Sequence, residues 1–185
     1  MKNIIQGCRQ RNVKAQKLLY TKHVDRLYYI IYRYTKDRFE IENLLQDVFL
    51  KIFNKIDSFD ANKGSFATWS RTIAIRTALN GIKKSKIDFS YIEDYPELEN
   101  VIAVSDIDNY DAEELLDLIN SISDKYRIMF NLYEIDGYSH DDISKLLGIT
   151  ASTSRSSLTR AKKIIRKKIL KSKLKFNGST KQISR

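Results

Sequence analysis

A cluster of hydroxyl and guanidinium side chains between residues 150 and 163 is the part of this sequence best suited to bind another molecule. If these residues form a helix, at about 100° per residue one side of it carries hydroxyls and cations together. The set comprises Ser152, Thr153, Arg155, Ser156, Thr159, Arg160 and Lys163. Such groups hydrogen-bond base edges and phosphates when a helix enters a DNA major groove. Because Thr150 to Arg185 also contains no Asp or Glu, the sequence predicts a DNA-reading helix.

The elements needed to position this helix follow a helix-turn-helix pattern. Ser139 followed by Asp142 is a capping signal for a first short helix, and Gly148 is suited to ending it. Thr150 can cap a second helix, predicted to continue through Leu170 without Gly or Pro. The inner side of this second helix would hold Ser154, Leu158, Ala161 and Ile165. Two capped helices joined by a Gly-Ile-Thr turn favour a helix-turn-helix over the alternative, a basic and solvated surface helix.

A second candidate surface comes from residues 39–56, the clearest amphipathic helix pattern in the chain. Apolar residues with helical spacing predict a buried stripe made of Ile41, Leu44, Leu45, Val48, Phe49, Ile52, Phe53 and Ile56. The opposite face would hold Asn43, Gln46, Asp47, Leu50 and Asn54. An apolar anchor with a polar rim, such as Leu50 among these neighbours, is typical of partner-binding patches. A single exposed leucine also needs no explanation, so both interpretations stay open at this point.

The next segment carries cations and amides suited to nucleic acid. Asp57–Ser65 is rich in turn-forming residues, and Ser65 is predicted to cap a helix over Phe66–Lys84. The polar side of that helix would hold Arg71, Arg76, Asn80, Lys83 and Lys84. The pattern indicates a nucleic-acid surface, with a solvated face around a buried Trp69 as the alternative.

Residues 1–36 indicate a binding site less clearly than the segments above. Residues 1–10 are expected to be poorly ordered, whereas residues 12–36 follow a helical pattern rich in tyrosine. Tyrosines interleaved with arginines could stack on single-stranded DNA. We favour the simpler interpretation, in which the tyrosines belong to the core and its half-buried rim.

Composition and charge set the fold class. The chain has 185 residues, a formal charge of +10, six Gly and one Pro, which favours long helices and an all-α fold. The charge is unevenly distributed, because Asp88 to Asp117 contains many acids and no Lys or Arg. Two basic, nucleic-acid-binding modules joined by an acidic connector are therefore predicted. Shorter helices at 112–122 and 124–135 are expected to support the helix-turn-helix.

Catalysis, metal binding and membrane insertion find no support in the sequence. The single Cys8 excludes an internal disulfide, and His23 and His140 show no metal-ligand spacing. The sequence contains no Gly-rich phosphate loop and no nucleophile elbow. It also contains no apolar run of 18 residues and no signal-peptide core. We therefore expect a cytoplasmic protein that is not an enzyme and has no catalytic residue, metal, other cofactor or small-molecule substrate.

The predicted organisation is two small helical domains joined by a linker, the second of which contains the helix-turn-helix. The boundaries are residues 1–85 for the first domain, 86–110 for the acidic linker, 111–175 for the second domain and 176–185 for a basic tail.

Two blocks of the sequence resemble a known family. Residues 42–84 (ENLLQDVFLKIFNKIDSFDANKGSFATWSRTIAIRTALNGIKK) look like conserved region 2 of the extracytoplasmic-function (ECF, group IV) bacterial RNA polymerase sigma factors, and residues 122–163 look like region 4. The order of the blocks makes the resemblance specific, since a lone helix-turn-helix would fit many regulator families. The resemblance implies a promoter-specificity subunit whose partners are core RNA polymerase (the β′ clamp helices and the β subunit), promoter DNA and an anti-sigma factor.

The resemblance also implies roles for particular residues. The helix with the Leu-Leu-Gln-Asp segment would bind the β′ clamp helices through Asn43, Gln46, Asp47, Leu50 and Asn54. The −10 element would be melted and read by Asp60, Asn62, Lys63, Ser65, Arg71, Arg76, Asn80, Lys83 and Lys84. Within this set, the Asp60–Ser65 loop would form a pocket for an extruded base. The −35 duplex would be read by Ser152, Thr153, Arg155, Ser156, Thr159, Arg160 and Lys163.

Three positions depart from the family pattern. Ser154 stands where the family often has valine, which predicts weaker packing of the second helix. Ser157 stands where a basic residue is frequent, which predicts the loss of a DNA contact, and Asn43 replaces a frequent acid. Two other functions remain as alternatives: a dimeric helix-turn-helix regulator that acts without the polymerase, and an adaptor that binds another protein through the Leu50 face.

Overall fold

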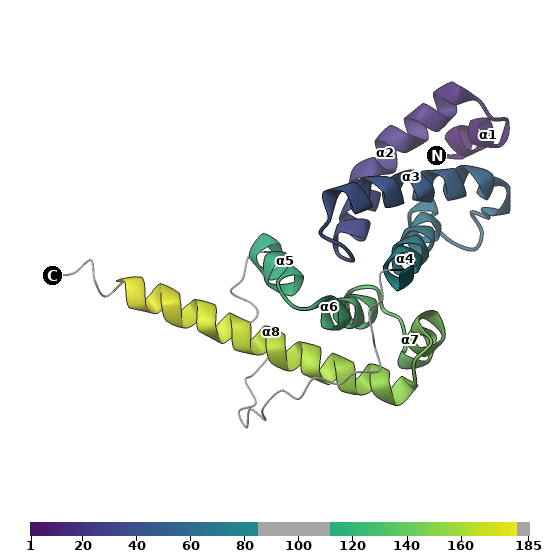
Figure 1. Ribbon diagram of the computed structural model, residues 1–185. Coiled ribbons are helices and arrows are strands. Elements are labelled where there is room, and N and C mark those ends of the chain that lie inside the picture. Colours follow the sequence, from purple (N-terminus) through teal and green to yellow (C-terminus); the bar gives the residue numbers. More distant parts are fainter. Residues whose placement is uncertain (85–111, 181–185) are drawn as a thin grey trace. The chain divides into compact units, whose positions relative to one another are not determined.

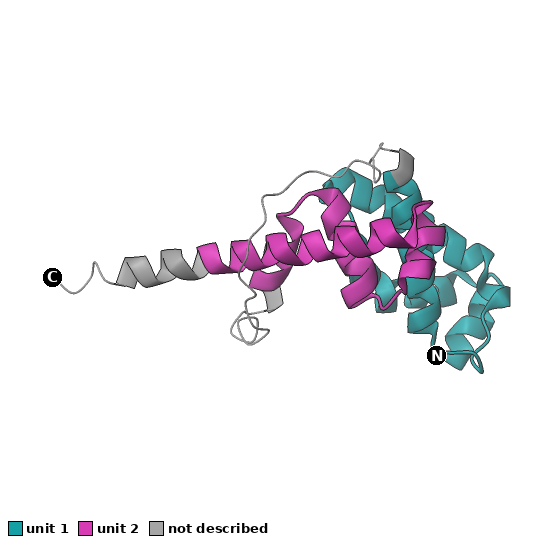
Figure 2. Cartoon of the chain, turned by 90° about the horizontal axis from the view of Figure 1, so that it is seen from below, with its two compact units in different colours: residues 1–87 teal, residues 88–185 magenta. Residues whose placement is uncertain are grey.

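A computed structural model describes residues 1–84 and 112–180, and within these ranges the chain is helical and contains no strand (Figure 1). The predicted all-α fold is confirmed. The chain divides into two compact units, residues 1–87 and residues 88–185 (Figure 2). The predicted acidic linker, residues 86–110, lies outside the described residues.

Over residues 1–84, unit 1 contains four α-helices and one 3-10 turn. Their bounds are α1 Lys2–Arg9, α2 Val13–Tyr32, α3 Arg38–Asn54, η1 Ile56–Ser58 and α4 Phe66–Lys84. Side-chain caps start the longer helices: the backbone N–H of Ala15 donates to Asn12 Oδ1, and those of Phe39 and Glu40 donate to Asp37 Oδ1. Each cap satisfies an amide that has no partner inside the helix, which fixes where α2 and α3 begin.

The core of unit 1 is built around α3, which packs against both α2 and α4. Its predicted apolar stripe is buried at Ile41, Leu44, Leu45, Val48, Phe49 and Ile52, and Ile56 in η1 is buried as well. Phe53 is only half-buried. Each fully buried side chain of this size contributes about 1.5–3 kcal/mol, so burial of the stripe is a large stabilising contribution to the packing of α2 and α4 on α3.

Helix α1 corrects the expectation that residues 1–10 are poorly ordered. Lys2–Arg9 is helical and packs on α2 and on η1. Ile5 and Cys8 are buried in this contact. The approach to α2 is close because residue 7 is glycine: a Cβ at Gly7 would lie 2.6 Å from Cβ of Ala15.

Unit 2 contains a helical support and the helix-turn-helix. Its elements are α5 Ala112–Asn120, α6 Asp124–Phe130, a π-helical turn η3 Asn131–Ile135, α7 His140–Leu147 and α8 Ala151–Thr180. The segment 124–135 was predicted as one helix, and it changes to π geometry at Asn131. The second helix of the motif is longer than predicted, since α8 continues past Leu170 to Thr180.

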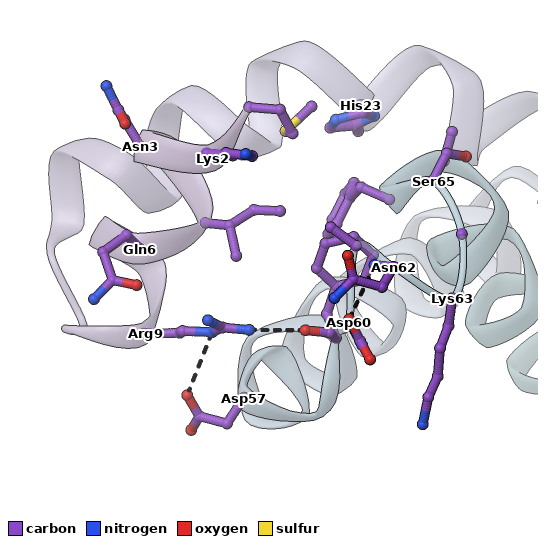
Figure 3. A pocket seen from close by; sticks show the side chains of 17 residues that line it. Lys2, Asn3, Gln6, Arg9, His23, Asp57, Asp60, Asn62, Lys63 and Ser65 are labelled. Atoms are coloured by element: carbon purple, nitrogen blue, oxygen red, sulfur yellow. Dashed lines mark hydrogen bonds and ion pairs between the residues drawn. The ribbon is translucent and has the colours of Figure 1, made fainter.

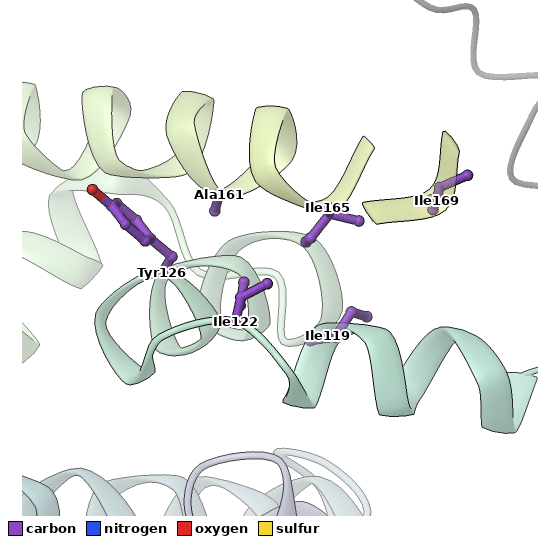
Figure 4. Close-up of a cluster of buried hydrophobic side chains, with 6 residues drawn as sticks. All are labelled: Ile119, Ile122, Tyr126, Ala161, Ile165 and Ile169. Atoms are coloured by element: carbon purple, nitrogen blue, oxygen red, sulfur yellow. The ribbon is translucent and has the colours of Figure 1, made fainter. Parts of the chain in front are cut away.

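One apolar cluster joins α8 to the supporting helices (Figure 4). Ile119, Ile122 and Tyr126 come from α5, α6 and the connection between them, and they meet three residues of α8. Those three are Ala161, Ile165 and Ile169. The predicted supporting role of the helices before the motif is confirmed by this packing.

The turn between α7 and α8 has the predicted chemistry. Ser139 and Asp142 form a complete capping box at the start of α7, and Gly148 ends the helix with a φ of 73°. In this left-handed region a residue with a Cβ would be strained. The backbone N–H of Thr153 donates to Thr150 Oγ1 at 3.0 Å, so Thr150 caps α8.

The contact between α1 and α2 can be tested by moving one methyl group. Gly7→Ala should destabilise the docking of α1 by about 1–3 kcal/mol, because the added Cβ overlaps that of Ala15. Hydrogen exchange of the α1 amides measures this free energy. The double variant Gly7→Ala/Ala15→Gly transfers the methyl group between the helices and should restore protection. Unchanged exchange in Gly7→Ala would contradict the close packing.

Candidate nucleic-acid and partner-binding surfaces

The structure places the predicted duplex-reading residues along one side of α8. Ser152, Arg155, Thr159 and Lys163 are exposed, whereas Thr153, Ser156 and Arg160 are half-buried. Several hydroxyls already donate within the helix: Ser156 Oγ donates to the carbonyl of Thr153, and Thr159 Oγ1 to that of Arg155. A hydroxyl that donates in this way still offers its oxygen as an acceptor. The exposed part of this surface therefore combines cationic donors with hydroxyl acceptors.

The inner side of α8 is fixed to the rest of unit 2 through Ser154, which is fully buried. Ser154 Oγ donates to Met129 Sδ at 3.2 Å and lies 2.9 Å from His140 Nδ1. The tautomer of His140 decides which of these two groups donates in the second contact. The His140 ring in turn stacks on Tyr133, with ring centroids 4.4 Å apart. Serine at this position thus connects α6, α7 and α8 through polar contacts, and the weaker packing expected relative to valine stays a prediction.

Ser157 does not face DNA. Only 1% of its surface is exposed, so it belongs to the inner side of α8. The expectation that a basic residue here would add a DNA contact stays a prediction.

Burial and the neighbouring cations favour the neutral form of the His140 imidazole. Burial lowers the pKa of His140 below its usual value of 6.5, the cation of Arg155 lowers it further, and Asp141 partly opposes them. Lys162 also lowers this pKa, and its Nζ pairs with Glu134 Oε1 at 2.6 Å. The ion pair ties α8 to the π-helical turn at a second point.

On unit 1 the predicted partner-binding residues share one face of α3. Asn43, Gln46, Asp47, Leu50 and Asn54 are all exposed. Leu50 is 60% exposed and lies on the face opposite the buried stripe of the same helix. The arrangement is an apolar side chain within a polar rim, as the sequence pattern indicates.

The loop between η1 and α4 is held by its own side chains. The backbone N–H of Asn62 donates to Asp60 Oδ1 at 2.9 Å, and that of Thr68 donates to Ser65 Oγ at 3.1 Å. Ser65 therefore caps α4, as predicted. Behind the loop, Phe66 lies between three aromatic rings, with ring centroids at 4.8 Å from His23, 5.6 Å from Phe59 and 5.6 Å from Trp69.

The predicted residues of α4 do not all lie together. Arg76 and Asn80 are exposed on one face, whereas Arg71 is half-buried and about 140° around the axis from Arg76. Arg71 thus projects from a different side of α4. The side chains of Lys83 and Lys84 lie outside the described residues.

A pocket of about 1230 Å³ lies between the loop and α1 (Figure 3). The loop contributes Asp60, Asn62, Lys63 and Ser65, which the sequence analysis singled out. The opposite wall comes from α1, and His23 of α2 lines the pocket as well. Sequence reasoning missed this second wall. The spacing of Ile5 and Cys8 could have indicated a short amphipathic helix, but a helix of eight residues carries no local signal of where it docks.

In the described residues we find no group of three or more His, Cys, Asp and Glu side chains placed to hold a metal ion. Among the helices of those residues, none combines the length and the apolar character that a membrane span requires.

Comparisons with known proteins match both units. The family "Sigma-70 region 2" matches residues 19–87, and "Sigma-70, region 4" matches residues 112–165. The chain is 31% identical over 157 residues to "ECF RNA polymerase sigma factor SigW" of Bacillus subtilis, covering 78% of this chain and 83% of that protein. It is 26% identical over 179 residues to "ECF RNA polymerase sigma-E factor" of Escherichia coli K12, covering 90% and 92%.

Among solved structures, the sigma factor RpoE in complex with the anti-sigma factor NepR from Bartonella quintana is similar at a TM-score of 0.48 and 20% sequence identity. The similarity covers 86% of this chain and 98% of that one.

The lowered pKa of His140, caused first by burial and then by the cation of Arg155, predicts a pH dependence for unit 2. A folded-state pKa below the unfolded value means that stability is complete above about pH 6.5 and falls as acid protonates the imidazole. The fall is at most about 1.4 kcal/mol per pH unit for one proton. His140→Asn keeps a side chain that can hydrogen-bond Ser154 but does not titrate, so hydrogen exchange of the α7 and α8 amides should lose less protection between pH 7.5 and 5.5. Equal losses in both proteins would contradict the assignment.

Proposed function

The chain belongs to the ECF family of RNA polymerase sigma factors, and from this membership we propose which of its surfaces performs each step of promoter recognition. The protein is a sigma factor for RNA polymerase, and its partners are the core enzyme and promoter DNA. A dimeric helix-turn-helix regulator is not favoured, because it would leave unit 1 and its match to region 2 without a role.

We propose that α8 reads the −35 element as duplex DNA. The support is the exposed side of the helix, which presents Arg155, Thr159 and Lys163 and is held by the caps at Thr150 and Ser139. Guanidinium groups bond the acceptor edge of guanine, and hydroxyls bond bases or phosphates. The carboxylate-free sequence from Thr150 onward adds phosphate affinity without sequence preference.

We propose that the Leu50 face of α3 binds core polymerase at the β′ clamp helices. Its exposed apolar anchor and polar rim support this role. Further contact with the β subunit is proposed from the family resemblance alone.

We propose that the loop of residues 60–65 and the outward face of α4 bind the −10 element. The pocket beside the loop would take a base extruded from the duplex, and Arg76 and Asn80 would contact the separated strand. Flipping a base costs a few kcal/mol, which contacts inside a pocket must repay. Arg71 would act from another side of α4, on phosphates. Lys83 and Lys84 are proposed for the same strand.

The remaining assignments follow from this mechanism. Residues 1–85 would bind polymerase and the −10 element, residues 111–175 the −35 element, and the linker 86–110 would hold the two at the promoter spacing. Residues 176–185 would add nonspecific phosphate affinity. We further propose that the protein belongs to group IV, works in the cytoplasm where promoters are, catalyses no reaction itself and is held inactive by an anti-sigma factor.

The first experiment is run-off transcription with bacterial core polymerase on a genomic fragment library, with and without this protein. Discrete new start sites are expected, and Leu50→Asp should abolish them because it places a charge on the polymerase-binding face. Leu18→Asp is the matched control, since Leu18 is also exposed, at 54%, but lies on α2. If no new transcripts appeared while the protein alone bound a symmetric duplex site, the dimeric regulator would replace the sigma assignment.

Duplex reading by α8 is tested with the promoters that this assay selects. Arg155→Ala should weaken binding to them by about 1–3 kcal/mol and relax the preference at one −35 position. Lys167→Ala, an exposed lysine outside the proposed set, should lower affinity evenly for all sequences. Titrations at several salt concentrations separate the two effects. An even loss in Arg155→Ala would show that this residue contacts only phosphate.

A further inference from the structure

Helix α1 lies outside the part of the chain that the region 2 family matches, which begins at residue 19. It nevertheless forms one wall of the pocket in unit 1. Lys2, Asn3, Gln6 and Arg9 all line the pocket, opposite the loop that carries Asn62. In Figure 3 the two walls face each other across the cavity, with His23 at one end and Arg9 at the other.

Arg9 ties the two walls together. Its Nη2 donates to the carbonyl oxygen of Phe59 at 2.7 Å, and its Nε lies 4.0 Å from Asp57 Oδ1 (Figure 3). The hydrogen bond from the charged guanidinium is the stronger contact, because the ion pair is long and its carboxylate is 80% exposed. Phe59 opens the loop that reaches Ser65, so Arg9 sets the distance between α1 and that loop.

The pocket holds the kinds of group that bind a nucleotide. His23 is 8% exposed, its ring is tilted by 53° against that of Phe66, and its Nε2 has no hydrogen-bond partner. Burial lowers the pKa of His23, and the cations of Lys22 and Arg26 add to this, so the ring is neutral. The neutral ring thus adds an aromatic group and a buried, unsatisfied nitrogen to the lining of the pocket. The amides of Gln6 and Asn62 can bond a base edge, and the Lys2 ammonium can bond a phosphate.

We propose that α1 is the second wall of the base pocket and a determinant of which nucleotide the pocket accepts, with Arg9 as the positioning residue that sets its width. This inference rests on the proposed function of the 60–65 loop, which would take an extruded base of the −10 element. Gln6 and Lys2 would contact that nucleotide directly from α1. The ligand class is a single deoxynucleotide within a separated DNA strand.

The test uses the full chain with core polymerase and a promoter selected in the run-off assay. Each position of the −10 element is replaced by all four bases, and open-complex formation is measured for each template. The wild-type protein should discriminate among bases at one position, typically by about 5- to 150-fold. Arg9→Ala should lower that ratio by at least about threefold, a small part of such a preference. Arg9→Lys should keep part of it, because a lysine retains the charge and can reach only one of the two acceptors.

Two further variants separate pocket geometry from folding. Gln6→Ala changes an exposed side chain of the wall and should alter the preference without loss of stability. Gly7→Ala pushes α1 away from α2 and should lower the ratio, and Gly7→Ala/Ala15→Gly should restore it. Lys14→Ala is the charge-matched control, since Lys14 is exposed and does not line the pocket.

The outcomes distinguish the inference from the function on which it rests. If the wild-type protein shows no base preference at any −10 position, the proposed pocket for the extruded base fails. If the wild-type protein discriminates and the Arg9, Gln6 and Gly7 variants keep the same ratio, the pocket stands and the role of α1 is refuted. A uniform loss of activity on all four templates would make Arg9 merely structural and would also refute the inference.

Discussion

Burial of the apolar stripe of α3 is the interaction on which unit 1 depends. The stripe holds α2 on one side and α4 on the other, and it leaves the remaining side of α3 to solvent. That solvent side is where Leu50 and its polar neighbours lie. Because one helix supplies both surfaces, the position of the proposed polymerase-binding face relative to α4 is fixed by the packing of the core. The partner surface and the surface proposed to read single-stranded DNA therefore cannot vary independently.

In unit 2, fewer buried apolar residues hold the helix that carries the proposed DNA-binding surface, α8. Ala161, Ile165 and Ile169 anchor the middle of α8 to α5 and α6, while its first turns project toward the proposed duplex. The first turn is held by the polar contacts of Ser154 with His140 and Met129, and the middle of the helix also carries the ion pair of Lys162 with Glu134. Directional hydrogen bonds fix the rotation of the helix about its axis, which apolar packing alone controls less strictly. The rotation decides which side chains face a groove.

The sequence predicted well what depends on neighbours along the chain. The stripe of α3, the capping box at Ser139, the left-handed Gly148 and the caps at Ser65 and Thr150 are all local patterns, and the structure contains each of them. It predicted poorly what depends on contacts between distant segments. The docking of α1, the burial of Ser157 and the contacts of Ser154 with other helices arise only when distant segments pack together. Arg71 and Arg76 share one polar side in the sequence prediction, but they lie on different sides of α4 because the packing of that helix decides which side is buried.

The ordered state of α1 has an entropic consequence for any strand that enters the pocket. Fixing the backbone of one residue costs about 1–2 kcal/mol at 25 °C, and α1 comprises eight residues. Here the burial of Ile5 and Cys8 and the hydrogen bond from Arg9 to the carbonyl oxygen of Phe59 offset this entropic cost during folding. A nucleotide that touches this wall meets a preorganised surface, so little of its binding free energy is lost in ordering protein. A chain that ordered the same helix only on contact with DNA would bind more weakly through the same side chains.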